Sequence, residues 1–191
     1  MTSGARRLAA LLFFSLAAHA EGWDSAALMS EMAQVQTSRA RFVETRHIAL
    51  LTQPLELKGS LSYERPHRLA KHVHSPVDEL LSVDGDALTL VNRTKGEQRV
   101  LSLREQPAAG ALVSSIRATL AGDLAELERH YKVELSGARS AWRLRLVPRN
   151  LQLARHVAEI VLSGAQARLE RIETLEKSGD RSVMTIVHDA K

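Results

Sequence analysis

Short segments in which apolar and polar residues alternate recur along most of this chain, and turn signals separate them. In residues 55–63, for example, Leu57 and Leu61 fall on one side of an extended chain. A period of two is typical of β-strands with one buried face. Turns such as Asp84-Gly85 are too short for helical crossovers, so we expect antiparallel pairing. The expected strands begin near Ala40 and continue with residues 55–63, 69–73, 80–83, 87–91, 99–103, 131–135, 141–147, 157–162, 169–175 and 183–187.

Three other segments have helical spacing. In residues 25–36, Leu28 and Met32 fall on one face of a helix. Residues 108–120 repeat apolar side chains four positions apart, and residues 123–129 are expected to form a short second helix after them. One helix before the strands and two in the middle predict an α+β fold.

The first twenty residues are typical of a secretory signal peptide. Arg6 and Arg7 precede an apolar run that is too short to span a bilayer, and Ala18 and Ala20 provide the small residues that signal peptidase requires. We therefore expect cleavage after Ala20 and export to the periplasm. No repeat or linker divides the rest, so residues 21–191 are predicted to form a single soluble domain.

The composition excludes several classes of protein. The chain has no cysteine, so we expect neither a disulfide nor a lipid-modified cysteine. The formal net charge of +4 includes Arg6 and Arg7, and the remaining charges are nearly balanced and scattered. Nucleic-acid binders have a basic patch, so no nucleic-acid partner is expected. The protein is also predicted to be a monomer.

No arrangement of residues suggests catalysis. Asp78 and Glu79 are adjacent on an expected strand, so their carboxylates point to opposite faces and cannot flank one bond. His72 and His74 share a strand face, but no third ligand has a fixed relation to them, and a surface histidine pair is preferred to a metal site. We therefore predict no enzyme, no metal and no cofactor.

The apolar strand faces must be covered, and few helices are available for this. A long antiparallel sheet with one apolar face packs against helices or curves around its own core. From these patterns alone, two interpretations remain open. Either helices and sheet close on a dry core, or a concave sheet and its helices enclose a cavity for an apolar ligand.

Four quoted segments resemble one known family. Residues 59–69, GSLSYERPHRL, and residues 75–90, SPVDELLSVDGDALTL, are similar to a G-x-L-x-x-x-R-P segment and the hairpin after it in the LolA family of periplasmic outer-membrane lipoprotein carriers. Residues 38–46, SRARFVETR, resemble the family's F-x-A-x-F-x-Q strand, with Glu44 where glutamine is usual. Residues 179–186, GDRSVMTI, resemble a late strand. The resemblance is to a LolA-related protein without the family's C-terminal extension.

The resemblance implies a fold and a function. The fold is an incomplete, half-open antiparallel β-barrel, a strongly curved sheet whose concave face is covered by a lid of helices. By the family's motif, Arg65 would hydrogen-bond carbonyl groups of the lid, which is expected in residues 25–36 and 108–120, and would keep the empty cavity closed. The expected cavity-lining residues are Phe42, Leu57, Leu61, Tyr63, Leu69, Leu112, Ile116, Leu120, Trp142, Leu144, Leu146, Met184 and Ile186.

Such a protein would carry the acyl chains of a lipoprotein, lipid or glycolipid toward the outer membrane. Its partners would be an inner-membrane transporter and an outer-membrane acceptor. The alternative is an envelope sensor or assembly partner that uses the same fold to bind lipid or protein without transporting it.

Overall fold

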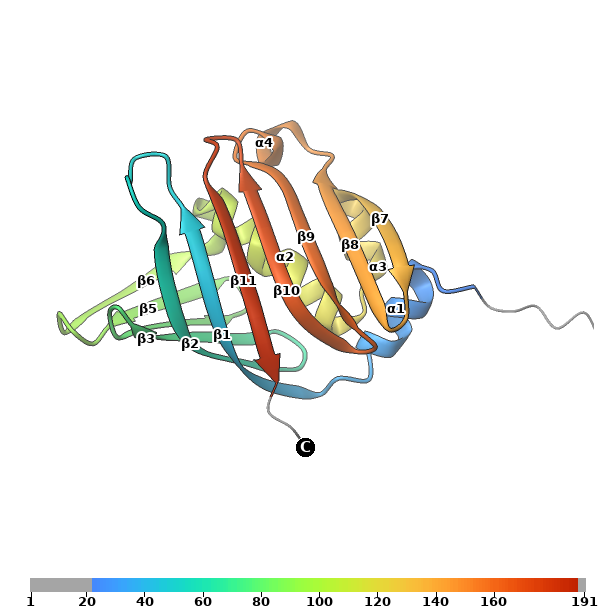
Figure 1. Cartoon of the computed structure of the whole chain (residues 1–191), viewed down its shortest axis with the longest axis horizontal. Coiled ribbons are helices and arrows are strands. Elements are labelled where there is room, and N and C mark those ends of the chain that lie inside the picture. The colour runs from blue at the N-terminus through green and yellow to red at the C-terminus, as the bar shows by residue number, and fades with distance from the viewer. Residues whose placement is uncertain (1–21, 189–191) are drawn as a thin grey trace, which may run out of the picture.

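The structure is a computed structural model that describes residues 22–188 (Figure 1). The expected signal peptide, residues 1–20, lies outside this part. Eleven strands form one antiparallel sheet in the order β6-β5-β4-β3-β2-β1-β11-β10-β9-β8-β7. The strands are β1 Thr37–His47, β2 Leu55–Glu64, β3 Arg68–Ser75, β4 Glu79–Asp84, β5 Ala87–Asn92, β6 Glu97–Ser102, β7 Tyr131–Ala138, β8 Ala141–Pro148, β9 Val157–Ala165, β10 Arg168–Glu176 and β11 Arg181–His188.

The sheet is strongly curved but does not close. Strands β6 and β7 are its two edges and are not paired with each other. In Figure 1, β7 to β11 and β1 run side by side, β3 to β6 bend away from them, and the helices lie behind the sheet. This arrangement confirms the predicted α+β fold, an incomplete antiparallel barrel with helices on its concave face.

The strand predictions agree closely with the structure. Every segment that alternation predicted as a strand lies within an observed strand, except that Leu103 belongs to a short 3-10 helix instead. The turn predicted at Asp84-Gly85 joins β4 to β5. Alternation was a reliable signal because most strands have one packed face and one face toward water.

The helices differ from the predictions in two respects. The first helix ends at Met32 rather than at residue 36: the N–H of Val35 turns back to the carbonyl of Met32, and the chain then straightens to pair Thr37 of β1 with Glu64 of β2. Two short helices, η1 and α4, were not predicted because they are too short to show a helical period. The helices are α1 Ser25–Met32, η1 Leu103–Glu105, α2 Pro107–Ala121, α3 Leu124–His130 and α4 Leu151–Ala154.

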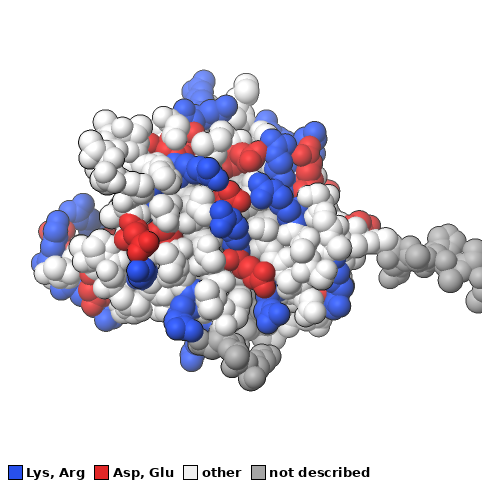
Figure 2. Space-filling view, viewed as in Figure 1, with Lys and Arg blue, Asp and Glu red and all other residues white. Residues whose placement is uncertain are grey.

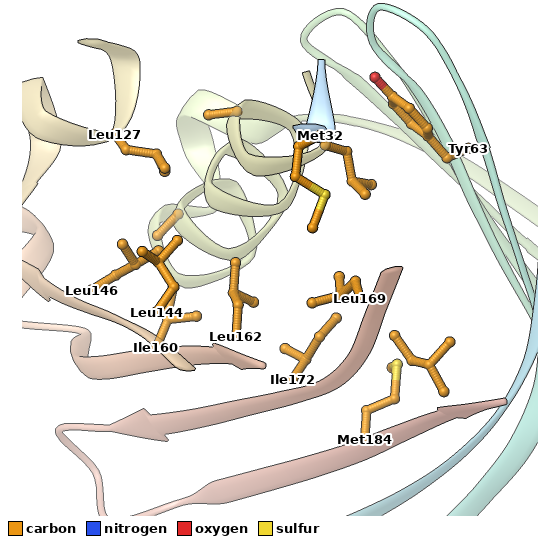
Figure 3. Packing of buried hydrophobic residues seen from close by; sticks show 14 of the residues in the cluster. Met32, Tyr63, Leu127, Leu144, Leu146, Ile160, Leu162, Leu169, Ile172 and Met184 are labelled. Atoms are coloured by element: carbon orange, nitrogen blue, oxygen red, sulfur yellow. The ribbon is translucent and has the colours of Figure 1, made fainter. Parts of the chain in front are cut away.

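The main core lies between the helices and the concave face of the sheet, mainly over β7 to β11 but with members from β1 to β3. Figure 3 shows Leu144, Leu162 and Ile172 pointing from these strands toward the helices, with Leu127 of α3 opposite them. Leu144 and Leu162 have no exposed surface. Complete burial of several leucines and isoleucines stabilises this half by about 2 kcal/mol for each side chain.

The outer face of the same strands carries paired charges. Arg145 bridges Glu134 and Glu159 from neighbouring strands at 2.9 and 2.5 Å, and Arg143 lies 3.3 Å from Glu173. Figure 2 shows basic and acidic side chains interspersed over this face. Each exposed pair contributes little to stability, but together they keep the outer face polar.

Helix length also bears on membrane topology. Among residues 22–188, no helix is both long enough and apolar enough to cross a membrane.

Candidate functional site

The helices cover the two halves of the concave face unequally. Helix α3 packs on β7, α2 on β9, and α4 on β8 and β9. Trp142 and Leu146 of β8 lie beneath this cover and are at most 1 % exposed. The β8–β9 region is therefore a filled core.

The β2–β5 half of the concave face combines buried and half-buried side chains. Pairing aligns Leu61 of β2, Lys71 of β3, Leu81 of β4 and Leu90 of β5 in one row across the sheet. We call Leu61, Leu81 and Leu90 the leucine row, and all three are half-buried. Val113 of α2 packs against the cluster that includes two of them. The helices therefore leave this row partly accessible.

The predicted lining residues lie together in the main core or against it. Those in β8 are packed most tightly, and those of the leucine-row half and of α2 are more accessible. The buried members are Phe42, Leu57, Tyr63, Leu120, Trp142, Leu144, Leu146, Met184 and Ile186, and the half-buried members are Leu61, Leu69, Leu112 and Ile116.

Helix α2 packs through small side chains and Leu120 rather than through the whole apolar stripe that its sequence suggests. Ala111, Ser115 and Ala118 are buried, whereas Leu112 and Ile116 remain half-buried. Small side chains let a helix approach its neighbours closely, because little volume separates the two backbones. The larger side chains of α2 thereby stay partly accessible.

Arg65 contacts the end of the first lid helix. Its Nη1 donates a hydrogen bond to the carbonyl of Ala33, just beyond α1, and its backbone N–H donates to the carbonyl of Gln36 at 2.9 Å. Carbonyl groups at a helix C-terminus lack intrahelical partners and carry partial negative charge, so a guanidinium suits them. The structure thus places Arg65 at the C-terminal end of α1.

Gly122 brings α1 and α2 together. It ends α2 with φ +73°, and a Cβ added there would lie 2.3 Å from the carbonyl oxygen of Met29 and 2.8 Å from the Cβ of Ala33. No larger residue fits at this distance. The two lid helices therefore meet at the same end of α1 that Arg65 contacts.

Helix α2 is attached to both halves of the sheet by side-chain hydrogen bonds. The buried Tyr131 hydroxyl, at the start of β7, donates to the carbonyl of Ala111 at 3.0 Å. On the other side, Arg117 Nη1 donates to the carbonyl of Gly85, in the β4–β5 turn, at 2.5 Å. Arg117 was not predicted from the sequence, because nothing in its local pattern indicates a partner 32 residues away.

A pocket of about 590 Å³ lies beside this second attachment. It is bordered by the β4–β5 turn, by η1 and by one face of α2. Leu103 and Ala111 contribute buried apolar surface, and Arg104 and Arg117 contribute positive charge. The pocket therefore marks an opening between α2 and the leucine-row half of the sheet.

A charged cluster lies on the mostly apolar concave face. Glu44 of β1 is 3 % exposed and accepts hydrogen bonds from Arg46 Nε and Ser182 Oγ, both at 2.7 Å, and from Lys71 Nζ. Burial by itself would raise the pKa of Glu44, but Lys71 and Arg46 hold that pKa below its ordinary value. Burial lowers the pKa of Lys71, although Glu44 opposes this. Both residues occupy inward positions of alternating strands, which is the signal that could have identified them.

Two tyrosines are buried at this site. Burial raises the pKa of Tyr131 to about 12. Burial also raises the pKa of Tyr63, although Arg65 opposes the shift, and the Tyr63 hydroxyl has no hydrogen-bond partner among the described residues. Figure 3 shows Tyr63 on β2, across the interior from Leu162 and Ile172.

The histidine pair lies on the opposite face of β3. His72 Nε2 is 2.7 Å from Asp78 Oδ1, and the rings of His72 and His74 are 4.1 Å apart between centroids. Within residues 22–188 there is no group of three His, Cys, Asp or Glu side chains suited to a metal ion.

Comparison with known proteins gives a family. The family described as "Outer membrane lipoprotein carrier protein LolA-like" matches residues 17–190. No curated protein is significantly similar to this chain in sequence.

Several solved structures are similar to this chain at low sequence identity. An uncharacterised conserved protein from Thermus thermophilus is similar with a TM-score of 0.50 and 11 % identity, over 86 % of each chain. A DUF1329 family protein from Desulfovibrio piger has a TM-score of 0.48 and 12 % identity, over 87 % of this chain and 91 % of that one. A LolA superfamily protein from Nitrosomonas europaea has a TM-score of 0.46 and 10 % identity, over 87 % and 94 %.

Proposed function

Because this chain belongs to the family of LolA-like outer membrane lipoprotein carrier proteins, we propose that it binds acyl chains between its curved sheet and its helices. The cargo is a lipoprotein or another acylated lipid, which the protein carries through the periplasm toward the outer membrane. An inner-membrane transporter would supply the cargo, and an outer-membrane acceptor would take it.

The observation that carries this proposal is the half-buried leucine row on the β2–β5 part of the concave face. On the β8–β9 part of the concave face, by contrast, the inward leucines and isoleucine have no exposed surface. Leu61, Leu81 and Leu90 stay partly accessible although they point inward. Transfer of an acyl chain onto such a surface recovers about 0.8 kcal/mol per buried methylene, so a chain of about a dozen carbons would contribute about 10 kcal/mol.

The attachment of the helices supports a carrier that can also release its cargo. Arg65, Arg117 and Tyr131 hold α1 and α2 to the sheet, each through a side-chain hydrogen bond to a backbone carbonyl. Each such bond contributes about 1 kcal/mol, or about 2 kcal/mol where the donor is charged. A cover held in this way can move aside for a ligand and return afterwards, so the closed empty state can compete with the loaded one.

A binding and transfer experiment tests the proposal. The purified, delipidated protein should bind a fluorescent fatty acid saturably, and the loaded protein should pass an acylated peptide to acceptor vesicles faster than the peptide moves alone. Absence of saturable binding would contradict the proposal. Binding without accelerated transfer would contradict the carrier function and support the alternative of a lipid-binding sensor or assembly partner.

A further inference from the structure

Lys71 is the only charged residue in the row that pairing aligns across β1 to β5, within the part of the chain that the structure describes. Its neighbours in the row are Ala40, Leu61, Leu81 and Leu90. A lysine at an inward position of such a strand loses hydration, which costs free energy unless the ammonium finds partners. Its presence there therefore calls for a compensating interaction.

Among the described residues, the partners of Lys71 satisfy only part of its ammonium. One N–H of Lys71 donates to Glu44, and Nζ lies 4.9 Å from the centroid of the Phe42 ring. An ammonium has three donors. Lys71 is 16 % exposed, so its side chain is not completely enclosed.

Glu44 does not depend on Lys71 alone. Its carboxylate also accepts from Arg46 and from Ser182. The cluster thus has two cations around one carboxylate. The next carboxylate on the concave face is Glu79, which attracts Lys71 electrostatically without forming an ion pair with it in the described chain. If Lys71 turned to a ligand, Arg46 and Ser182 would still satisfy Glu44.

We propose that Lys71 binds the acidic headgroup of the amphiphile, so that the site selects acyl chains that carry a carboxylate or phosphate. The chain would lie along the leucine row, and the headgroup would reach the Lys71 ammonium between Leu61 and Leu81. An ion pair formed at such a partly desolvated position is stronger than one in water, because the surrounding dielectric constant is lower. This inference rests on the proposed function and adds the chemical class of the cargo.

Matched amphiphiles test the headgroup assignment. Displacement of cis-parinaric acid fluorescence would measure the affinities of lauric acid, dodecyl phosphate and methyl laurate, which share one chain length. The wild-type protein should bind the two acids at least about tenfold more tightly than the neutral ester. Comparison of the affinities for lauric acid and dodecyl phosphate shows whether the site prefers a carboxylate or a phosphate.

Variants at Lys71 separate the inference from the proposed function. Lys71→Met should weaken the binding of lauric acid and dodecyl phosphate by about tenfold and leave the binding of methyl laurate unchanged. The methionine keeps an apolar stem but removes the charge. Lys71→Arg should retain the preference for acids. Lys58→Met, at an exposed lysine on the outer face of β2, is the control and should bind like the wild type.

A second variant does not require the removal of Lys71. Glu44→Gln weakens the competition for the ammonium, so lauric acid should bind more tightly while methyl laurate is unaffected. If Lys71→Met and Glu44→Gln leave the acid-to-ester ratio unchanged, the headgroup assignment is wrong although acyl binding stands. If the wild-type protein binds none of the three amphiphiles, the proposed function is wrong as well.

Discussion

The side chain of Arg65, at the end of β2, donates a hydrogen bond to the backbone carbonyl of Ala33, just beyond the end of α1. This contact joins the leucine-row half of the sheet to the first lid helix. A backbone acceptor does not depend on the side chain at position 33, so the contact depends on the donor alone.

Replacement of this donor should loosen the lid. We expect Arg65→Leu to lower the free energy of unfolding by about 1–3 kcal/mol, because a charged donor is lost to a carbonyl that stays partly buried. The ligand-free variant should bind more of an environment-sensitive apolar dye and should release a bound fatty acid with altered kinetics. Denaturant titration measures the loss of stability. Fluorescence measures the dye binding and, by stopped flow, the release of the fatty acid.

The matched control for this prediction is Arg68→Leu. Arg68 lies nearby at the start of β3, but its side chain is 62 % exposed and its partners are the exposed carboxylates of Glu64 and Asp84. Its loss should change little. Equal dye binding and release by wild type and Arg65→Leu would contradict a role for Arg65 in holding the lid.

Gly122 should tolerate no side chain. We expect Gly122→Ala to destabilise the protein by more than Gly96→Ala, because both glycines have positive φ but only Gly122 lies against another helix. The conformational cost common to both is about 1–2 kcal/mol. Denaturant unfolding of the two variants isolates the excess at Gly122, and equal losses would show that α1 moves away without cost.

The tyrosines should ionise late. The pKa values of Tyr63 and Tyr131 lie above the ordinary 10.0, and that of Tyr131 is about 12. The folded protein therefore keeps both phenols protonated at a pH at which the unfolded chain has lost these protons. Stability should therefore fall as pH rises from about 10 toward 12, since the folded state binds more protons in that window. The ultraviolet absorbance of tyrosinate should appear together with unfolding, and its appearance in the native state near pH 10 would contradict the burial.

Tyr131→Phe tests the attachment of α2 directly. The variant keeps the ring and removes the hydrogen bond to Ala111, so the free energy of unfolding should fall by about 1 kcal/mol. If the bond also restrains α2, the variant should exchange a bound fatty acid faster than the wild type. Unchanged exchange, together with lower stability, would assign Tyr131 to the core alone.

Glu44 should give the protein an acid-sensitive contribution to stability. Its pKa is below the ordinary 4.5 in the folded state, so the contribution is present in full above that value and is lost as pH falls through the lower folded pKa. Glu44→Gln should therefore be less stable than wild type at neutral pH, with the difference shrinking at low pH. Thermal unfolding of both proteins from neutral to low pH measures this difference in stability.

The control for this acid effect is Glu56→Gln, at an exposed glutamate that pairs with Lys58 on the outer face of β2. This variant should unfold like the wild type at every pH. If the stability difference between Glu44→Gln and the wild type is also independent of pH, the buried ion pairs of Glu44 do not cause the acid sensitivity.

The fold was largely predictable from local pattern, because most strands have one packed and one solvated face. Alternation located the strands, and the Asp84-Gly85 turn fixed the register of β4 and β5. The end of α1 was less predictable. Residues 33–36 have a helix-compatible sequence, and only the need to pair Thr37 with Glu64 ends the helix earlier.

The site was predicted in part. The R-P motif indicated Arg65, and the structure places this residue against α1. Arg117 and the Glu44–Lys71 pair were missed, since their partners are 27 to 32 residues distant and no local period reports such a contact. In the apolar stripe of α2, Leu120 is buried and Leu112 and Ile116 are half-buried, and whether this stripe lines a cavity stays a prediction.

By itself, the sequence of this protein determined where the chain is extended, where it turns and which side chains face inward, because these properties depend on residues a few positions apart. Only the tertiary structure decided that the helices fill one half of the concave face and leave the leucine row accessible in the other. Coverage depends on the path of α2 over a curved sheet, which is set by contacts between residues distant in sequence, such as Arg117 with Gly85 and Tyr131 with Ala111.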